Sequence, residues 1–101
     1  MKLLNEGVTN LNMIDVSNIT DLSYIFSDYP YLKDIDISKW NVSKCENFSH
    51  MFYNAASFNG DLSNWDVSNG KDFSYMFSNT KIRFDVNKWD MSNGNNFEGM
   101  F

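Results

Sequence analysis

A block of thirteen residues with a fixed order of hydrophobic and polar positions occurs four times in this chain of 101 residues. In its clearest copy, Trp65 is followed by Asp-Val-Ser-Asn-Gly-Lys-Asp-Phe-Ser-Tyr-Met-Phe. The copies occupy residues 14–26, 40–52, 65–77 and 89–101, so they start 26, 25 and 24 residues apart. A period of roughly 20–50 residues is typical of proteins built from stacked structural repeats. The pattern therefore predicts a repeat architecture in which most of the hydrophobic positions form the core.

The hydrophobic spacing changes partway through each copy. Trp65 and Val67 are two residues apart, which is the alternation expected of a short strand with one buried face. Phe73, Met76 and Phe77 then follow at i, i+3 and i+4, the spacing of one helical face. Each copy is therefore predicted to form a short strand followed by a short helix, and neither could bury its apolar face without neighbouring copies.

These elements predict a fold of the α/β class. We expect a right-handed, leucine-rich-repeat-like solenoid of about four coils of 24–26 residues, each with a short parallel strand and a short helix. The coils would cover about 10–35, 36–60, 61–84 and 85–101, the last one truncated, in a single repeat domain from 10 to 101. Residues 1–9 match the repeat poorly and are expected to be a frayed lead-in or a degenerate cap.

Composition and charge narrow the possible partners. The formal net charge of −5 argues against nucleic acid or an anionic membrane surface as the main partner. No stretch has the length of a spanning helix or the make-up of a secretory leader, so no membrane insertion is expected. Cys45 is the only cysteine; it cannot form an internal disulfide, and no cofactor or zinc spacing occurs. A buried small hydrophobe or an inert surface thiol are the expected roles of Cys45.

The pattern W-D-V-S-x-x-x-x-F/M-S-x-M-F, followed by connectors such as 55–61, resembles the bacterial surface protein repeat of about 26 residues, known as the BspA-like family. The resemblance covers roughly residues 10–101. It implies display at a bacterial cell surface or outside the cell, with adhesion or protein–protein recognition as the role, and it brings no catalytic residues. Because this chain carries no export signal, a cytoplasmic location is the alternative.

One set of equivalent polar residues, which we call the Asx column, raises the question of a metal site. Its members follow the first residue of each copy: Asp15, Asn41, Asp66 and Asp90. In a parallel ladder their side chains would stack about 4.8 Å apart on an outer face. Asp15, Asp66 and Asp90 are therefore weak candidates for a calcium site or for a surface that binds a basic partner. The alternative is that each side chain accepts backbone hydrogen bonds at a turn.

A second set of equivalent residues, Ser17, Ser43, Ser68 and Ser92, bears on catalysis. A serine nucleophile needs a base, and the one histidine, His50, has no equivalent in the other copies. We expect these serines to cap helices, with Ser43 and Glu46 forming a capping box. The chain is therefore not expected to be an enzyme.

Tyr24, His50 and Tyr75 occupy the position just before the closing Met/Ile-Phe pair, and Gly99 takes this position in the fourth copy. On a helix with Phe73 inward, Tyr75 is rotated by roughly 200° and faces outward. The three residues would then form an exposed aromatic stripe, and aromatic residues are enriched at binding hot spots. The alternative is that the rings lie against neighbouring coils and serve structure alone.

These observations predict a non-catalytic repeat module for protein–protein recognition or adhesion. The alternatives are a structural spacer without a specific ligand and a calcium-stabilised solenoid. A repeat stack without polar caps leaves an apolar layer at its end, so homo-oligomers through the uncapped ends are also expected.

Overall fold

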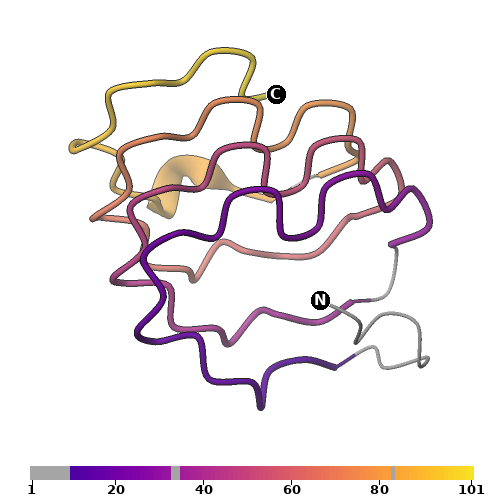
Figure 1. The fold of residues 1–101 in the computed structure, drawn as a ribbon, viewed down its shortest axis with the longest axis horizontal. Helices are drawn as coiled ribbons and strands as arrows, with labels where there is room; N and C mark the ends of the chain where they lie inside the picture. Colours follow the sequence, from indigo (N-terminus) through magenta and orange to yellow (C-terminus); the bar gives the residue numbers. More distant parts are fainter. Residues whose placement is uncertain (1–9, 33–34, 83) are drawn as a thin grey trace.

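The computed structural model describes residues 10–32, 35–82 and 84–101; the lead-in or cap predicted for residues 1–9 lies outside the described residues. We use the term rows for the four segments 14–26, 40–52, 65–77 and 89–101. The rows run side by side in Figure 1. Backbone hydrogen bonds join equivalent positions of neighbouring rows. The N–H of Leu22 donates to the carbonyl of Asn47 at 3.0 Å, and Phe48 donates in the same way to Asp72 at 2.8 Å.

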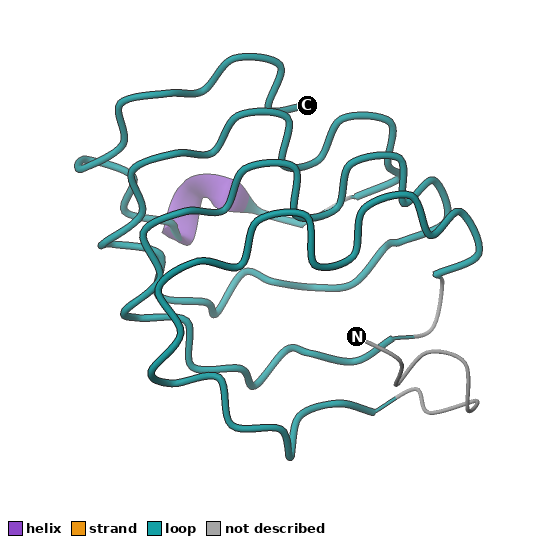
Figure 2. Cartoon of the chain, in the orientation of Figure 1, coloured by secondary structure: helices purple, strands orange, loops and turns teal. Residues whose placement is uncertain are grey.

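The predicted α/β class is wrong, and so is the leucine-rich-repeat-like solenoid with a strand and a helix in each coil. Over the described residues, the regular structure consists of one three-residue 3-10 helix, η2 (Val86–Lys88), and isolated parallel β-bridges. The bridges are Asn10↔Asp36, Asp21↔Asn47, Asn47↔Asp72 and Asp72↔Asn96. The rest consists of loops and turns (Figure 2). The radius of gyration of 12.4 Å is close to the ~13 Å expected of a compact domain of this length.

Short polar side chains that bond to their own backbone explain the absence of helices and strands. Asp61, Asp66 and Asp72 each accept a hydrogen bond from the backbone N–H two residues further on, at 2.9–3.0 Å. The same Asx turn forms at Asn10, Asp15, Asp21, Asp36, Asn41, Asn47, Asp85, Asp90 and Asn96. Such bonds offer the backbone an alternative to helical and sheet ladders. The chain therefore turns three times in every repeat.

The spacing that suggested a helix comes from consecutive β-turns. The N–H of Met76 donates to the carbonyl of Phe73, and that of Ser78 to Tyr75, both at 3.3 Å. Tyr75 has a φ of 53°, in the left-handed region, which a right-handed helix cannot contain. Phe73, Met76 and Phe77 are nevertheless at most 1% exposed. The predicted core positions are correct, although the predicted element is not.

Aromatic rings stacked from row to row fill the core. Phe52 lies between Phe26 and Phe77, with ring centroids 5.6 Å apart on each side. Phe48 and Phe73 form a second stack, with centroids 5.4 Å apart. These rings are fully buried, and such pairs stabilise by about 0.5–1.5 kcal/mol beyond their area burial. Because each ring needs the one above and below it, the rows are stable only together.

The tryptophans tie the rows together with side-chain hydrogen bonds. The indole N–H of Trp65 donates to the buried carbonyl of Ile37 at 3.0 Å. The equivalent bonds run from Trp40 to Leu11 and from Trp89 to Leu62. Each tryptophan thus supplies a second donor to a carbonyl near the start of the preceding repeat unit, which also accepts a backbone N–H. These bonds explain why Trp recurs at this position.

Candidate functional site

The aromatic column, as we call Tyr24, His50 and Tyr75, is a continuous stack of rings across three rows. The Tyr24 and His50 ring centroids are 4.5 Å apart with the planes at 10°, and those of His50 and Tyr75 are 5.0 Å apart at 26°. Tyr24 is 56% exposed, and the other two rings are partly exposed. The column thus combines the two roles weighed for it: its rings lie against neighbouring rows and also face solvent. The sequence analysis placed these three residues on the outer face of a helix, but in the structure the column forms without a helix.

All three residues of the aromatic column have left-handed backbones, with φ values of 62°, 55° and 53°. Each is the third residue of a β-turn, as in the turn that ends when the N–H of Met51 donates to Phe48. A turn with positive φ at this residue normally selects glycine or asparagine. A bulky residue there costs on the order of 1–3 kcal/mol and persists only where the surroundings hold it. Gly99, with a φ of 60°, is the residue that conformation alone would select.

A second left-handed column lies beside the first and consists of Asp28, Asn54 and Asn79. These residue types tolerate positive φ well. The Asn54 amide donates to the carboxylate of Asp28, and the Asn79 amide donates to Asn54, both at 3.0 Å. Conformation explains the residues of this column but not the Tyr, His and Tyr of the aromatic column.

Tyr53 and Glu98 complete the surroundings of the aromatic column. The Tyr53 ring stands edge-on to both His50 and Tyr75, with centroids 5.3 Å and 6.3 Å away. The Glu98 carboxylate beside Tyr75, through its charge and a hydrogen bond, raises the pKa of the Tyr75 hydroxyl. A β-carbon added at Gly99 would come within 2.5 Å of the Tyr75 ring, so this ring lies directly against Gly99.

His50 lies at the centre of the column without a catalytic partner. Its Nδ1 is buried and has no hydrogen-bond partner within the described part of the chain. The serines Ser17, Ser43, Ser68 and Ser92 are not helix caps as predicted, because no helix starts there. Their backbone N–H groups donate instead to the Asx column, at 2.9–3.0 Å. Over the described residues, none of these four serines hydrogen-bonds to His50, which could otherwise act as its base.

The side chains of the Asx column accept backbone hydrogen bonds at turns, which was the alternative to a metal site. The hydroxyl of Ser68 adds a second hydrogen bond to Asp66, at 2.6 Å. Hydrogen bonds from the serine two residues on lower the pKa of Asp15, Asp66 and Asp90. No group of three or more His, Cys, Asp or Glu residues suited to hold a metal occurs among the residues that the structure describes.

Cys45 is fully buried, which fits the first of its two expected roles. Its thiol donates to the Asn47 carbonyl at 3.3 Å. Burial raises its pKa to about 11, so the thiol stays protonated and unreactive at neutral pH. The predicted capping box is wrong, because no helix begins at Ser43. Glu46 instead pairs with Lys71 of the next row at 2.8 Å.

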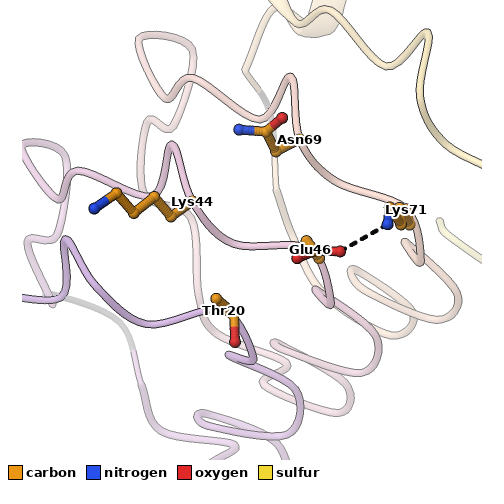
Figure 3. Close-up of a pocket in the computed structure, with 5 residues that line it drawn as sticks. All are labelled: Thr20, Lys44, Glu46, Asn69 and Lys71. Atoms are coloured by element: carbon orange, nitrogen blue, oxygen red, sulfur yellow. Dashed lines mark ion pairs between the residues drawn. The ribbon is translucent and has the colours of Figure 1, made fainter.

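A shallow groove of about 420 Å³ crosses the first three rows. Its lining residues are Thr20, Lys44, Glu46, Asn69 and Lys71. Figure 3 shows the Lys71–Glu46 ion pair and the side chain of Lys44, which extends away from that pair. Lys44 instead donates to Asn18 at 3.0 Å. The two lysines are thus already engaged, and the groove presents no converging charges for a ligand.

Sequence reasoning missed Tyr53, Asp28 and the groove. Tyr53 has serines, Ser27 and Ser78, at the equivalent positions, so the repeat gives no sign of it. The signal for the left-handed column of Asp28 was the recurrence of Asp or Asn four residues after the aromatic position.

The described residues contain no helix with the length and apolar character of a membrane span. No curated protein and no solved structure matches the chain. A family model, described as "Mycoplasma protein of unknown function, DUF285", matches residues 2–101. The match covers the four rows and the connectors between them, and the chain therefore belongs to this family.

Proposed function

We propose that this chain is a non-catalytic module that recognises a protein partner through the aromatic column. The observation that carries the proposal is the left-handed backbone of Tyr24, His50 and Tyr75. The equivalent residue of the fourth row is Gly99, so the bulky side chains of the other three rows are not what this backbone conformation favours. Strained backbones of this kind cluster at ligand-binding sites. Exposed tyrosine also provides large contact area at low conformational cost.

The module acts at a bacterial cell surface in this proposal. Support comes from the resemblance to the BspA-like surface repeat in the Trp, Ser, Met and Phe positions of rows such as 65–77. Protease treatment of intact cells, followed by detection of the chain with an antibody, tests the location. Loss of the chain from intact cells is expected, and full protection would contradict surface display.

The test of recognition compares a column variant with a matched control. The double variant Tyr24→Gly and Tyr75→Gly removes two rings and keeps a residue that accepts positive φ. The control is Met13→Ser. Met13 also belongs to the first repeat unit, and its side chain is 91% exposed. The bead-coupled chain is incubated with serum and extracellular-matrix proteins, and the captured proteins are identified by mass spectrometry. Proteins should be captured by the native chain and the control and lost with the double variant. An unchanged captured set would refute the proposal.

A further inference from the structure

Three asparagine–glycine pairs occur in the chain: Asn59-Gly60, Asn69-Gly70 and Asn93-Gly94. In such a pair the backbone nitrogen of the glycine is able to attack the side-chain amide carbon of the asparagine, because glycine has no side chain to shield that nitrogen. The attack releases ammonia and closes a cyclic succinimide. All three asparagines are exposed, so access to solvent does not distinguish the three pairs. Their hydrogen bonds do distinguish them.

Two hydrogen bonds oppose this reaction at Asn69-Gly70. The Asn69 amide donates to the carbonyl of Ser43 in the preceding row at 2.6 Å, and the Gly70 N–H donates to the carbonyl of Val67 at 2.8 Å. Ring closure moves the amide carbon onto the glycine nitrogen and takes the proton from that nitrogen, so both bonds must break first. The same two bonds form one row further on, from Asn93 to Ser68 at 2.7 Å and from Gly94 to Met91 at 2.9 Å.

Asn59-Gly60 lies in the connector between the rows 40–52 and 65–77 and lacks both bonds. Within the described part of the chain, neither the Asn59 amide nor the Gly60 N–H makes a hydrogen bond. We propose that Asn59-Gly60 is a self-modification site, where Asn59 loses its amide to water while the hydrogen bonds of the rows protect Asn69 and Asn93.

The reaction at Asn59 needs only water as its co-reactant. The Gly60 nitrogen gives its proton to hydroxide and bonds to the side-chain carbonyl carbon of Asn59. The carbon–nitrogen bond of the amide breaks, and its nitrogen takes a proton from water and leaves as ammonia. Water then opens the succinimide. Attack at the former side-chain carbonyl leaves an aspartate, whereas attack at the backbone carbonyl leaves an isoaspartate, whose main chain runs through the β-carbon.

The isoaspartate product would disturb the core beside Gly60. Gly60 lies directly against the ring of Phe58, since a β-carbon added at Gly60 would be 2.7 Å from that ring. Phe58 is fully buried and stacks on Phe52, with ring centroids 4.4 Å apart and planes at 9°. An isoaspartate adds a methylene to the main chain just before Gly60, and a close-packed interior accommodates such an addition poorly. The isoaspartate form should therefore melt at a lower temperature than the unmodified chain.

Incubation of the full 101-residue chain in mildly alkaline buffer tests the site, with peptide mapping by mass spectrometry to follow amide loss at each pair. Asn59 should lose its amide at least about tenfold faster than Asn69 and Asn93, because the hydrogen bonds that must break at those two add to the barrier. In guanidinium chloride that unfolds the chain, the three rates should become similar. Equal rates in the folded chain would overturn the inference. So would a lead of Asn59 that persists unchanged in the denaturant, because the flanking sequence would then decide the rate.

Two variants test the effect on the core by thermal melting. Asn59→Gln has a longer side chain that does not close the same ring, so this variant should keep its melting temperature after incubation. Asn59→Asp carries the charge of the product on a normal backbone and should melt like the fresh native chain, since an exposed charge contributes little to stability. The incubated native chain should melt at a lower temperature than all of these. A melting temperature equal to that of Asn59→Asp would refute the disturbance at Phe58.

Discussion

The left-handed backbone of His50 leads to a prediction that opposes the usual ranking of alanine and glycine. His50 has a φ of 55° and stacks on rings at 4.5 Å and 5.0 Å. A residue with a β-carbon loses about 1–2 kcal/mol in this conformation, and glycine loses none. Glycine costs about 0.5–1 kcal/mol through the larger entropy of its unfolded chain. We therefore expect His50→Gly to be more stable than His50→Ala by about 0.5–1 kcal/mol.

Both His50 variants lose the same three ring contacts, to Tyr24, Tyr53 and Tyr75, so their difference isolates the backbone. The contacts are worth about 0.5–1.5 kcal/mol each. Relative to the native chain, His50→Ala should therefore lose about 1.5–4.5 kcal/mol, and His50→Gly should recover part of that loss. Urea denaturation followed by tryptophan fluorescence gives the free energies of unfolding.

Ala56 supplies the matched control, since it lies in a turn and its φ is not positive. There Ala56→Gly should destabilise by about 0.5–1 kcal/mol. The opposite sign at the two positions is the signature of a left-handed residue. A His50→Ala variant at least as stable as His50→Gly would refute the conformation assigned to the aromatic column.

Three further predictions concern the core and the turns. Phe52→Ala should lower the free energy of unfolding by about 3–5 kcal/mol, because Phe52 is fully buried in its stack. Phe101 lies in the same stack but is 69% exposed, so Phe101→Ala should cost far less. Equal losses in urea denaturation would contradict the stacked core. Trp65→Phe should cost about 0.5–1.5 kcal/mol from the lost hydrogen bond, since the buried carbonyl of Ile37 keeps only the backbone N–H of Trp40 as a donor, and an unchanged unfolding free energy would argue against the indole bond. Hydrogen bonds lower the pKa of turn carboxylates such as Asp66, so their stabilisation is complete above the unfolded pKa of about 3.9 and is lost as the pH falls through the lower folded values. The melting temperature should therefore drop between about pH 5 and about pH 2, and a constant melting temperature would contradict this.

The sequence predicted the repeat and its core because both depend on side-chain type at equivalent positions. It also grouped Tyr24, His50 and Tyr75, since residues one repeat apart must lie in the same column whatever the local backbone. The helix was wrong because spacing such as that of Phe73 and Met76 is shared by a helix and by consecutive turns. Local hydrogen bonds decided between them.

A signal for those turns was present in the sequence. Asp61-Leu62-Ser63, Asp66-Val67-Ser68 and Asp72-Phe73-Ser74 repeat the order Asx, apolar, Ser three times within one unit. Each triplet forms an Asx turn with a buried residue at its centre. The turn propensity of these Asx and Ser residues, which recur three times within each repeat unit, would have predicted three turns per unit. The left-handed Tyr and His residues gave no such signal, because their residue types oppose the conformation they adopt.

The most direct test of the account is the pattern of nuclear Overhauser effects from the His50 ring in solution. The structure places this ring between those of Tyr24 and Tyr75, 26 and 25 residues away in the sequence. The account predicts ring-to-ring effects from His50 to both tyrosines. Effects from His50 to its sequence neighbours alone would show that the aromatic column does not form, and the proposed recognition surface would fall with it.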